Sequence, residues 1–269
     1  MIGLFSKHTS VAVLRVAAAD EGCAIIMGES EVERAMNRVA QTESYLKEKF
    51  KSESSGHDWA HLYRVYRTSL QILAGEAPHQ ADKQIVSLGA LLHDIADWKF
   101  HHGDESAGPR AAATWLKSLH TDEPTIQAVC TIISELSFKG AGVQTPMSTL
   151  EGKIVQDADR LDALGAVGIA RAFAYGGFKH RMMFDPGAPP HLHQTAEQYK
   201  AQQSTTVNHF FEKLLLLRDR MNTETARKLA EERHRFMVDF LDRFLKESHA
   251  DESVHLRLLR TFCQTENDS

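Results

Sequence analysis

The stretch KQIVSLGALLHDIADW, residues 83–98, carries one signal for the fold and one for chemistry. Its apolar residues recur at steps of three and four, which places them on one face of a helix: Ile85, Leu88, Leu92 and Ile95. The adjacent pair His93-Asp94 lies in the same apolar surroundings. Burying an imidazole and a carboxylate costs free energy unless they are paired or bound to a cation. Taken alone, the pair is also typical of a solvated helix end. The other polar clusters along the chain therefore decide between a metal site and a solvated end.

The same helical spacing recurs along most of the chain. A second apolar stripe leads up to Gly75, which can end a helix, and it consists of Leu62, Val65, Tyr66, Leu70 and Leu73. Further helices are predicted at about 110–119, 124–136 and 151–175, from a capping box at Thr195 and Gln198 towards Met221, and from a cap at Asn222 or Thr223 onward. No alternation of period two is long enough to specify a sheet. The sequence therefore predicts an all-α fold.

We expect one domain with extra helices at its C-terminal end. A chain of 269 residues is long enough to bury a substantial core. Residues 1–29 are interpreted as a weakly ordered extension, with Met27 as a candidate start site, and residues 248–269 as a polar tail that frays. Irregular stretches at 138–149 and 176–194 interrupt the helices. The second stretch is either a lid or substrate wall, or a plain connection.

The composition excludes several classes of protein. The formal net charge of -5 argues against a protein that coats nucleic acid or an anionic membrane, because both attract a broad positive field. No apolar run reaches the roughly 20 residues that a spanning helix needs. Cys23, Cys130 and Cys263 lie far apart and form no disulfide framework, which favours a reducing, cytoplasmic compartment.

Two further clusters can supply metal ligands. Upstream, GHDWAH at residues 56–61 places His57 and His61 one helical turn apart. Downstream, IVQDADRLD at residues 154–162 holds three acids at intervals of two and three: Asp157, Asp159 and Asp162. Each cluster alone is common on solvated surfaces. Three clusters in this order are much stronger evidence of a site.

On these residues the sequence resembles the HD-domain phosphohydrolase superfamily, whose pattern is a His, an adjacent His-Asp pair and a distant Asp. The resemblance selects His61, since Arg and Val follow it at three and four positions. It selects Asp159 within the Ala-Asp-Arg-Leu stretch, and the central pair is His93-Asp94. The implied metal ligands are therefore His61, His93, Asp94 and Asp159.

The resemblance extends beyond these ligands, over about residues 30–246. The segments LLHDIADWKF, SFKG, EGKIVQDADRLDALGA and STTVNHFFEKLLLLRDRMNTETA look like one bacterial subgroup of nucleotide pyrophosphohydrolase-like proteins. Residues 30–247 are thus expected to form the HD-type domain. The implied activity is hydrolysis of nucleoside or deoxynucleoside triphosphates, with monophosphate removal and phosphodiester cleavage left open.

Two imidazoles and two carboxylates make a mixed nitrogen and oxygen site, which suits Mn²⁺ first and also Fe²⁺ or Mg²⁺. Such an ion polarises a phosphate oxygen and lowers the pKa of a bound water. Asp97, one turn after Asp94, is the candidate to orient or deprotonate that water, and it matches an acidic residue of the alarmone-hydrolase branch. The alternative for Asp97 is a plain charge at a helix end.

Other polar residues near the motifs are candidates for supporting roles. His57 and Asp58 could accept a hydrogen bond that fixes the tautomer of a ligand imidazole. Four basic residues are candidates for neutralising substrate phosphates: Arg64, Lys99, Lys139 and Arg160.

Two other functions compete with phosphohydrolysis. HDWAH imitates the HExxH motif of zinc peptidases, but Asp replaces the Glu and this reading leaves the other clusters unexplained. A helical sensor could bind a phosphorylated nucleotide without turnover, although a water-activating acid favours an enzyme. A homodimer is weakly favoured, because the apolar region of Phe210-Phe211 and Leu214 to Leu217 could be a dimer face as readily as core.

Overall fold

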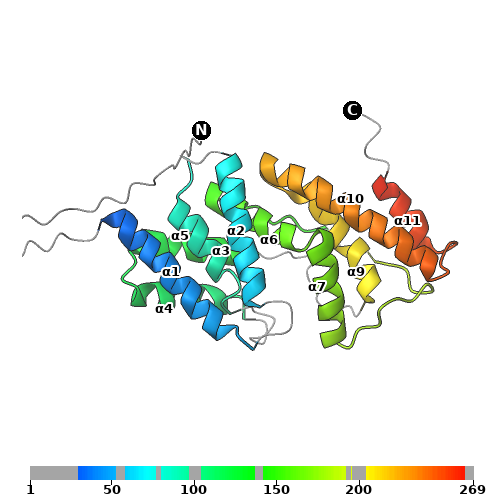
Figure 1. Ribbon diagram of the computed structural model, residues 1–269, viewed down its shortest axis with the longest axis horizontal. Helices are drawn as coiled ribbons and strands as arrows, with labels where there is room; N and C mark the ends of the chain where they lie inside the picture. The colour runs from blue at the N-terminus through cyan, green and yellow to red at the C-terminus, as the bar shows by residue number, and fades with distance from the viewer. Residues whose placement is uncertain are drawn as a thin grey trace, which may run out of the picture.

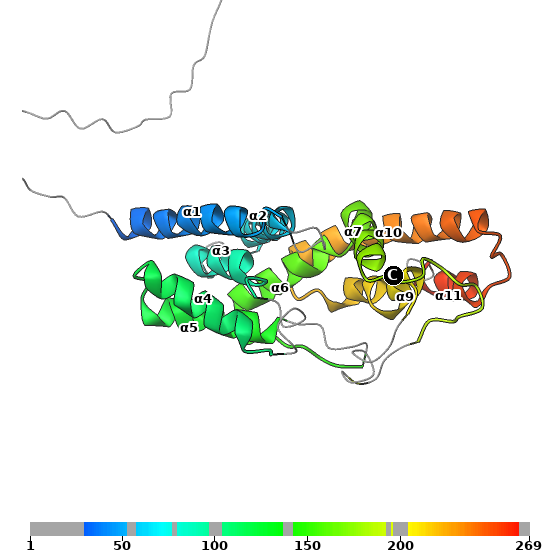
Figure 2. The ribbon, with the colours of Figure 1, turned by 90° about the horizontal axis from the view of Figure 1, so that it is seen from below.

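The computed structural model describes residues 30–52, 58–76, 80–96, 104–136, 142–191, 195 and 204–263. Regular structure in these residues is helical, without a strand, so the predicted all-α class is confirmed. The helices fall into two groups that share one central helix (Figures 1 and 2). The predicted extension at 1–29 and candidate start at Met27 lie outside the described residues.

The N-terminal group contains the helices that the sequence predicted near 62–75, 85–95, 110–119 and 124–136, and one further helix at its start. It consists of α1 (Glu31–Lys49), α2 (Trp59–Gly75), α3 (Lys83–Leu92), α4 (Ala107–Ser118) and α5 (Glu123–Glu135). Four of them begin at a side chain that accepts hydrogen bonds from the first turn, as helix N-termini require: Ser30, Asp58, Asp82 and Asp122. Their apolar faces enclose a small core that includes Leu46, Leu62, Leu92 and Leu116.

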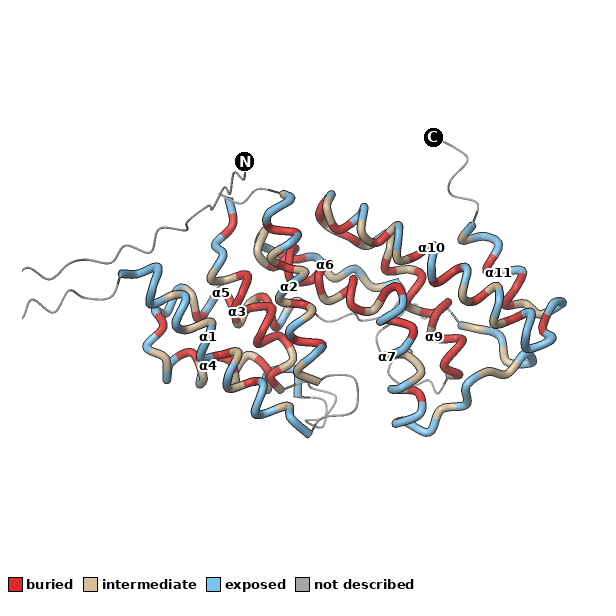
Figure 3. The backbone as a smooth tube through the Cα atoms, viewed as in Figure 1, coloured by how far each residue is buried: buried red, intermediate tan, exposed pale blue. Residues whose placement is uncertain are grey.

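Helix α6 (Leu150–Asp162) lies between the two groups (Figure 1). It packs against α2 and α3 on one side and against α10 (Glu224–Glu247) on another. Contact on several sides leaves even its polar residues Gln156, Asp157 and Arg160 buried. The burial map in Figure 3 shows this as a mostly red segment at the centre of the molecule. Polar groups buried this deeply need hydrogen-bonding partners.

The chain turns sharply between α6 and α7 (Gly165–Phe178), where the sequence predicted one helix over 151–175. Leu164 is extended and Gly165 has φ +71, a left-handed conformation that glycine adopts at little cost. A Cβ at Gly165 would also lie 3.1 Å from Cγ of Arg233. The single-helix prediction is therefore wrong, because the apolar periodicity continues through a backbone break.

The C-terminal group also differs from the prediction in its connections. Among the described residues a helix begins at Thr206, with Thr205 as its cap. Residues 196–203, which include Gln198 of the predicted capping box, lie outside the described residues. This helix, α9 (Thr206–Glu212), gives way to the 3-10 helix η2 (Leu214–Arg220) before reaching Met221. Thr223 then caps α10, as predicted.

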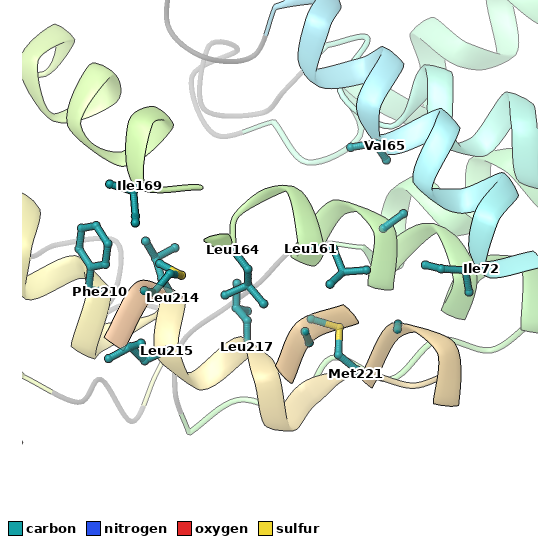
Figure 4. Close-up of a cluster of buried hydrophobic side chains, with 14 of the residues drawn as sticks. Val65, Ile72, Leu161, Leu164, Ile169, Phe210, Leu214, Leu215, Leu217 and Met221 are labelled. Carbon is teal, nitrogen blue, oxygen red and sulfur yellow. The ribbon is translucent and has the colours of Figure 1, made fainter. Parts of the chain in front are cut away.

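The larger core of the molecule lies between α6 and the C-terminal group. Figure 4 shows Leu161 and Leu164 of α6 and its turn packing with Leu217 and Met221. The candidate dimer face is part of this core, since its members are at most 4% exposed apart from Leu216, which is of intermediate burial: Phe210, Phe211, Leu214, Leu215 and Leu217. That apolar region therefore offers no ground for the expected homodimer.

The segment expected to fray contains one more helix. Residues Val254–Cys263 form α11, which packs on α10 and buries His255, Leu256 and Leu259. The fraying prediction is thus wrong for this part of the tail. Among the described helices, none combines the length and the apolar character that crossing a membrane requires.

Candidate metal centre

The predicted metal ligands converge from three helices. His61 lies in the first turn of α2, His93 caps the C-terminus of α3 with Asp94 next to it, and Asp159 lies in α6. The two imidazole Nε2 atoms are 3.1 Å apart. Asp94 Oδ2 lies 3.4 Å from Nε2 of His61 and 3.5 Å from that of His93. Asp159 Oδ1 is 3.7 Å from each of the same two nitrogens.

Both imidazoles present the same nitrogen to this centre. His61 donates from Nδ1 to Asp162 Oδ2 at 2.7 Å, and His93 donates from Nδ1 to the carbonyl of Ala90 at 2.8 Å. A neutral imidazole carries one proton, so a donating Nδ1 leaves Nε2 as an acceptor or metal ligand. Two such nitrogens at 3.1 Å repel each other unless a cation or a proton lies between them.

The donor set fits a divalent ion. His61, His93 and Asp94 offer ligand atoms that all lie within 4.8 Å of one another. Neighbouring ligands at about 2.1 Å from one ion are separated by roughly 3.0 to 3.4 Å. The separations of 3.1 to 3.5 Å agree. Asp159 is not part of this group of three, but its Oδ1 lies 3.7 Å from the same two nitrogens. Its side chain is 32% exposed, so the centre is open on the Asp159 side.

Asp162 holds His61 in place and is itself held by two arginines. Arg64 donates to both of its carboxylate oxygens, from Nε at 2.6 Å and from an Nη at 3.0 Å. Arg171 of α7 reaches back across the turn and donates to Oδ2 at 2.9 Å. Burial by itself raises the pKa of Asp162, but the hydrogen bonds from His61 and Arg64 outweigh it and keep that pKa well below its usual range. Asp162 is therefore ionised and fixes the His61 tautomer.

The proton affinity of His61 reflects the surrounding charges. Burial and repulsion from Arg171 lower its pKa, yet hydrogen bonds to Asp162 and Asp94 outweigh them and raise it. The cluster thus attracts positive charge at Nε2, where a proton and a metal ion compete.

Two of the predicted supporting residues, Asp58 and Arg160, make other contacts than the predicted ones. Asp58 caps α2, since its Oδ1 accepts from the backbone N–H of His61 at 2.8 Å, while Asp162 binds the imidazole. Asp58 therefore holds neither imidazole, because Nδ1 of His61 binds Asp162 and Nδ1 of His93 binds the carbonyl of Ala90. Arg160 points to another part of the molecule, where it donates to the carbonyl of Arg220 and to Thr145 Oγ1. The remaining candidates lie outside the described residues: His57, Asp97, Lys99 and Lys139.

Two residues that contact the centre were not assigned a role from the sequence. Asp162 had a signal, because a residue three positions after Asp159 lies on the same helical face. Arg171 had none, since its approach to Asp162 depends on the turn at Gly165. The peptidase alternative depends on His57, whereas the imidazole that faces His61 belongs to His93.

A known protein family matches the part of the chain that carries this candidate centre. The HD domain family model matches residues 58–164, a span that includes all four proposed ligands and Asp162. The chain belongs to the HD-domain superfamily of metal-dependent phosphohydrolases, and its fold is that of an HD-superfamily hydrolase.

One relative of known sequence is YpgQ of Bacillus subtilis (strain 168), an uncharacterised protein. The chain is 37% identical to it over 218 residues, which cover 80% of this chain and 95% of YpgQ. The crystal structure of YpgQ in complex with ADP matches with a TM-score of 0.60 at 37% identity, covering 78% of this chain and 97% of that one.

Two further solved structures are similar over the same extent. An HD-superfamily hydrolase from Bacillus thuringiensis has a TM-score of 0.61 at 40% identity, covering 80% of this chain and 99% of its own. A protein from Lactobacillus plantarum has a TM-score of 0.70 at 36% identity, covering 80% and 98%.

Proposed function

We propose that this protein hydrolyses nucleoside or deoxynucleoside triphosphates with release of pyrophosphate. One observation carries the metal-dependent part of the proposal. The Nε2 atoms of His61 and His93 lie 3.1 Å apart, with Nδ1 of each ring already donating to an acceptor. Carboxylate oxygens of Asp94 and Asp159 lie 3.4 to 3.7 Å from these nitrogens. That arrangement is costly without a cation and favourable with one.

The nucleotide part of the proposal has separate support. The related YpgQ has been crystallised in complex with ADP, which is a nucleoside diphosphate. The sequence segments quoted above resemble nucleotide pyrophosphohydrolase-like proteins. A triphosphate is the proposed substrate because its phosphate chain offers oxygens both to a metal ion and to basic side chains.

His61, His93, Asp94 and Asp159 would hold the ion, for which Mn²⁺ is the first choice on its mixed nitrogen and oxygen donors. A divalent ion in this position supplies Lewis-acid polarisation of a phosphoryl oxygen and lowers the pKa of water. Asp162 keeps the His61 ring oriented throughout, because Arg64 and Arg171 hold its carboxylate from two sides.

The remaining roles belong to side chains near the centre. We assign to Asp97 the orientation and deprotonation of the attacking water, since it follows Asp94 by one helical turn in the sequence. Lys99 and Lys139 are assigned to the substrate phosphates. Arg64 has part of its guanidinium committed to Asp162, so its contribution to substrate binding is the remaining charge.

A panel of nucleotides tested with several divalent ions examines this proposal. Ribo- and deoxyribonucleoside triphosphates, monophosphates and a phosphodiester are incubated with Mn²⁺, Mg²⁺, Fe²⁺ or Zn²⁺, and phosphate is resolved from pyrophosphate among the products. We expect pyrophosphate from triphosphates, with the highest rate in Mn²⁺. Orthophosphate from monophosphates would reassign the bond cleaved. Tight nucleotide binding without product over hours would indicate a sensor instead of an enzyme.

A further inference from the structure

A lysine at the end of α1 holds the turn that carries the His93-Asp94 pair. Lys49 Nζ donates to the carbonyl of Ile95, the residue after Asp94, at 2.9 Å. This turn follows the C-terminus of α3, where the last backbone carbonyls have no partner inside the helix. A cation is a favoured partner there, because the negative ends of the peptide dipoles face this terminus. Lys49 therefore fixes the backbone next to two proposed metal ligands.

The ammonium of Lys49 is itself held in place. Its Nζ lies 5.8 Å from the ring centroid of Tyr45 and 5.9 Å from that of Phe50, distances at which a cation is attracted to an aromatic ring. Helix α4 also packs closely on the turn, because a Cβ at Gly108 would lie 3.4 Å from the carbonyl oxygen of Ala96. The turn after α3 is thus bound by α1 and packed by α4.

An arginine of α10 has the same kind of contact at the end of α6. Arg233 donates from an Nη to the carbonyl of Leu161 at 2.5 Å, and that carbonyl belongs to the peptide group that leads into Asp162. Burial lowers the pKa of Arg233 while attraction to Asp162 opposes this, so the two charges interact. Its stem packs over the backbone at Gly165, where a Cβ would lie 3.2 Å from the Cβ of Arg233. Arg233 therefore fixes the end of α6.

Small shifts of these two backbone segments would disturb the metal centre. Asp94 Oδ2 lies 3.4 Å from Nε2 of His61 and 3.5 Å from that of His93, and Asp162 Oδ2 lies 2.7 Å from Nδ1 of His61. A binding constellation works only when its groups are held to within about 0.5 Å of the productive geometry. Displacement beside Asp94 moves a ligand, and displacement beside Asp162 releases the imidazole that it orients.

We propose that Lys49 and Arg233 are positioning residues of the metal centre, which hold the backbone beside Asp94 and Asp162 where the ion is bound. They act through these carboxylates. The inference rests on the proposed metal site, but not on the substrate or on the bond that is cleaved. Both residues lie outside residues 58–164, the span that the family model matches, so α1 and α10 each contribute to metal binding.

Charge and position predict opposite effects of removing either cation. A positive charge near the centre repels a divalent ion, so loss of the charge alone would tighten metal binding. Loss of the hydrogen bond frees the backbone beside a ligand, which weakens metal binding. We expect the second effect to prevail at Lys49, because this residue is exposed and its charge is screened by water and salt. At Arg233 the charge is offset by Asp162.

Titration of the full-length chain with Mn²⁺, followed by calorimetry, tests the inference. Lys49→Met and Arg233→Met keep an unbranched side chain but lose the donor, and Lys49→Arg restores a donor with its charge. The matched controls are Lys47→Met and Arg243→Met, which remove the same charge from exposed positions of the same two helices. Denaturant unfolding followed by circular dichroism measures the stability of each metal-free variant. The two cations are judged separately, so a variant that does not fold leaves the other one decisive.

We expect Mn²⁺ to bind about tenfold more weakly to Lys49→Met and Arg233→Met, and within about twofold of wild type to both controls and to Lys49→Arg. A purely structural role would lower stability and leave the affinity of the folded protein unchanged. The inference is overturned by unchanged or tighter binding in Lys49→Met and Arg233→Met, or by equal weakening in the controls. It is also overturned for Lys49 if Lys49→Arg binds no better than Lys49→Met.

The outcome for the proposed function is distinguishable in the same titrations. Wild-type protein that binds no Mn²⁺ would refute the metal centre itself, and the positioning role with it. Equal binding by wild type and variants would refute only the positioning role. Absence of nucleotide hydrolysis would change neither reading, because metal affinity is measured without substrate.

Discussion

Two buried carboxylates of α6, Asp157 and Asp162, lie on different sides of the helix and meet different partners. Asp162 faces the metal centre, where His61, Arg64 and Arg171 keep its pKa well below the usual range. Asp157 faces α10, where it accepts hydrogen bonds at 2.8 to 3.0 Å from backbone and side-chain groups of Asn222 and Thr223. Burial prevails there and raises its pKa.

The difference shows what neutral donors and counter-charges each accomplish. Neutral donors satisfy the Asp157 oxygens and fix the start of α10, yet they do not offset desolvation of the charge. The positive charges of Arg64 and Arg171, which bind Asp162, do offset the cost of desolvation. The Asp162 carboxylate therefore stays ionised and can orient an imidazole. Asp157 thus joins the two helix groups, whereas Asp162 is the residue that we propose orients a metal ligand.

The largest expected effect is on the metal-facing side. His93→Ala and Asp94→Ala each remove a ligand, so we expect activity to fall below detection and bound metal to be lost, with the helical circular-dichroism signal retained. Activity is measured by product release and metal content by elemental analysis of dialysed protein. Wild-type turnover in both variants would contradict the proposed centre.

Asp162→Asn tests whether the charge of Asp162 matters or only its shape. The amide removes the negative charge that pairs with Arg64 and Arg171. It also removes the charge that favours a proton on Nδ1 of His61. We expect metal affinity or activity to fall about 10- to 100-fold, as changes next to metal ligands commonly do. Metal titration of Asp162→Asn beside wild type measures this, and equal affinities would show that Asp162 is only a packing residue.

Asp157→Asn is the matched substitution on the other side of α6. An amide nitrogen now meets N–H donors of Asn222 and Thr223, so we expect a loss of about 1 to 3 kcal/mol in unfolding free energy. Metal affinity of the folded protein should stay near wild type. Denaturant unfolding and the same metal titration check both parts. A large fall in metal affinity with unchanged stability would show that Asp157, like Asp162, supports the metal centre.

His234 extends the comparison to a buried group of α10 that should be neutral. Burial lowers its pKa to about 4, from an ordinary value of 6.5, and repulsion from Arg218 adds to this. Because the unfolded chain then binds the proton more tightly, stability is lost as pH falls from about 6.5 towards 4. Between pH 7 and pH 5 the contribution of this group is about 2 kcal/mol.

The measurement is denaturant unfolding at pH 7 and pH 5 for wild type and His234→Leu. The variant should lose about 2 kcal/mol less than wild type over this interval. His249→Asn is the control, because His249 is exposed and asparagine tolerates its φ of 52. Identical acid sensitivity in wild type and His234→Leu would show that His234 is not the sensitive group.

Local sequence patterns predicted those parts of the fold that local interactions determine. The stripe from Leu62 to Leu73 predicted α2 because its apolar spacing and its end at Gly75 are properties of one helix. The break before Gly165 was missed, because alanines and branched residues continue helical spacing on both sides of it. Helix α11 was missed for another reason, since the polar residues around it conceal three residues that become buried only against α10.

The metal centre was predictable to a similar extent. His93 and Asp94 stand out within an apolar helix, and their resemblance to a known pattern selected His61 and Asp159. The sequence did not show that Asp159 and Asp162 contact different nitrogens of His61. Both acids share a helical face, and only the position of α2 places Asp162 at Nδ1 and Asp159 near Nε2. Arg171 follows Asp162 by nine residues, but it reaches that carboxylate only across the turn at Gly165, which no local pattern predicts.

The placement of α6 means that the span matched by the HD family model, residues 58–164, is no natural place to cut the chain. A fragment ending there would expose Leu161 and Leu164 to water and leave Asp157 without Asn222 and Thr223. Asp162 would lose Arg171 as well. The helices that carry the four proposed metal ligands are therefore stabilised by packing against the C-terminal group, which carries none of the four, and we expect the two groups to unfold in a single transition.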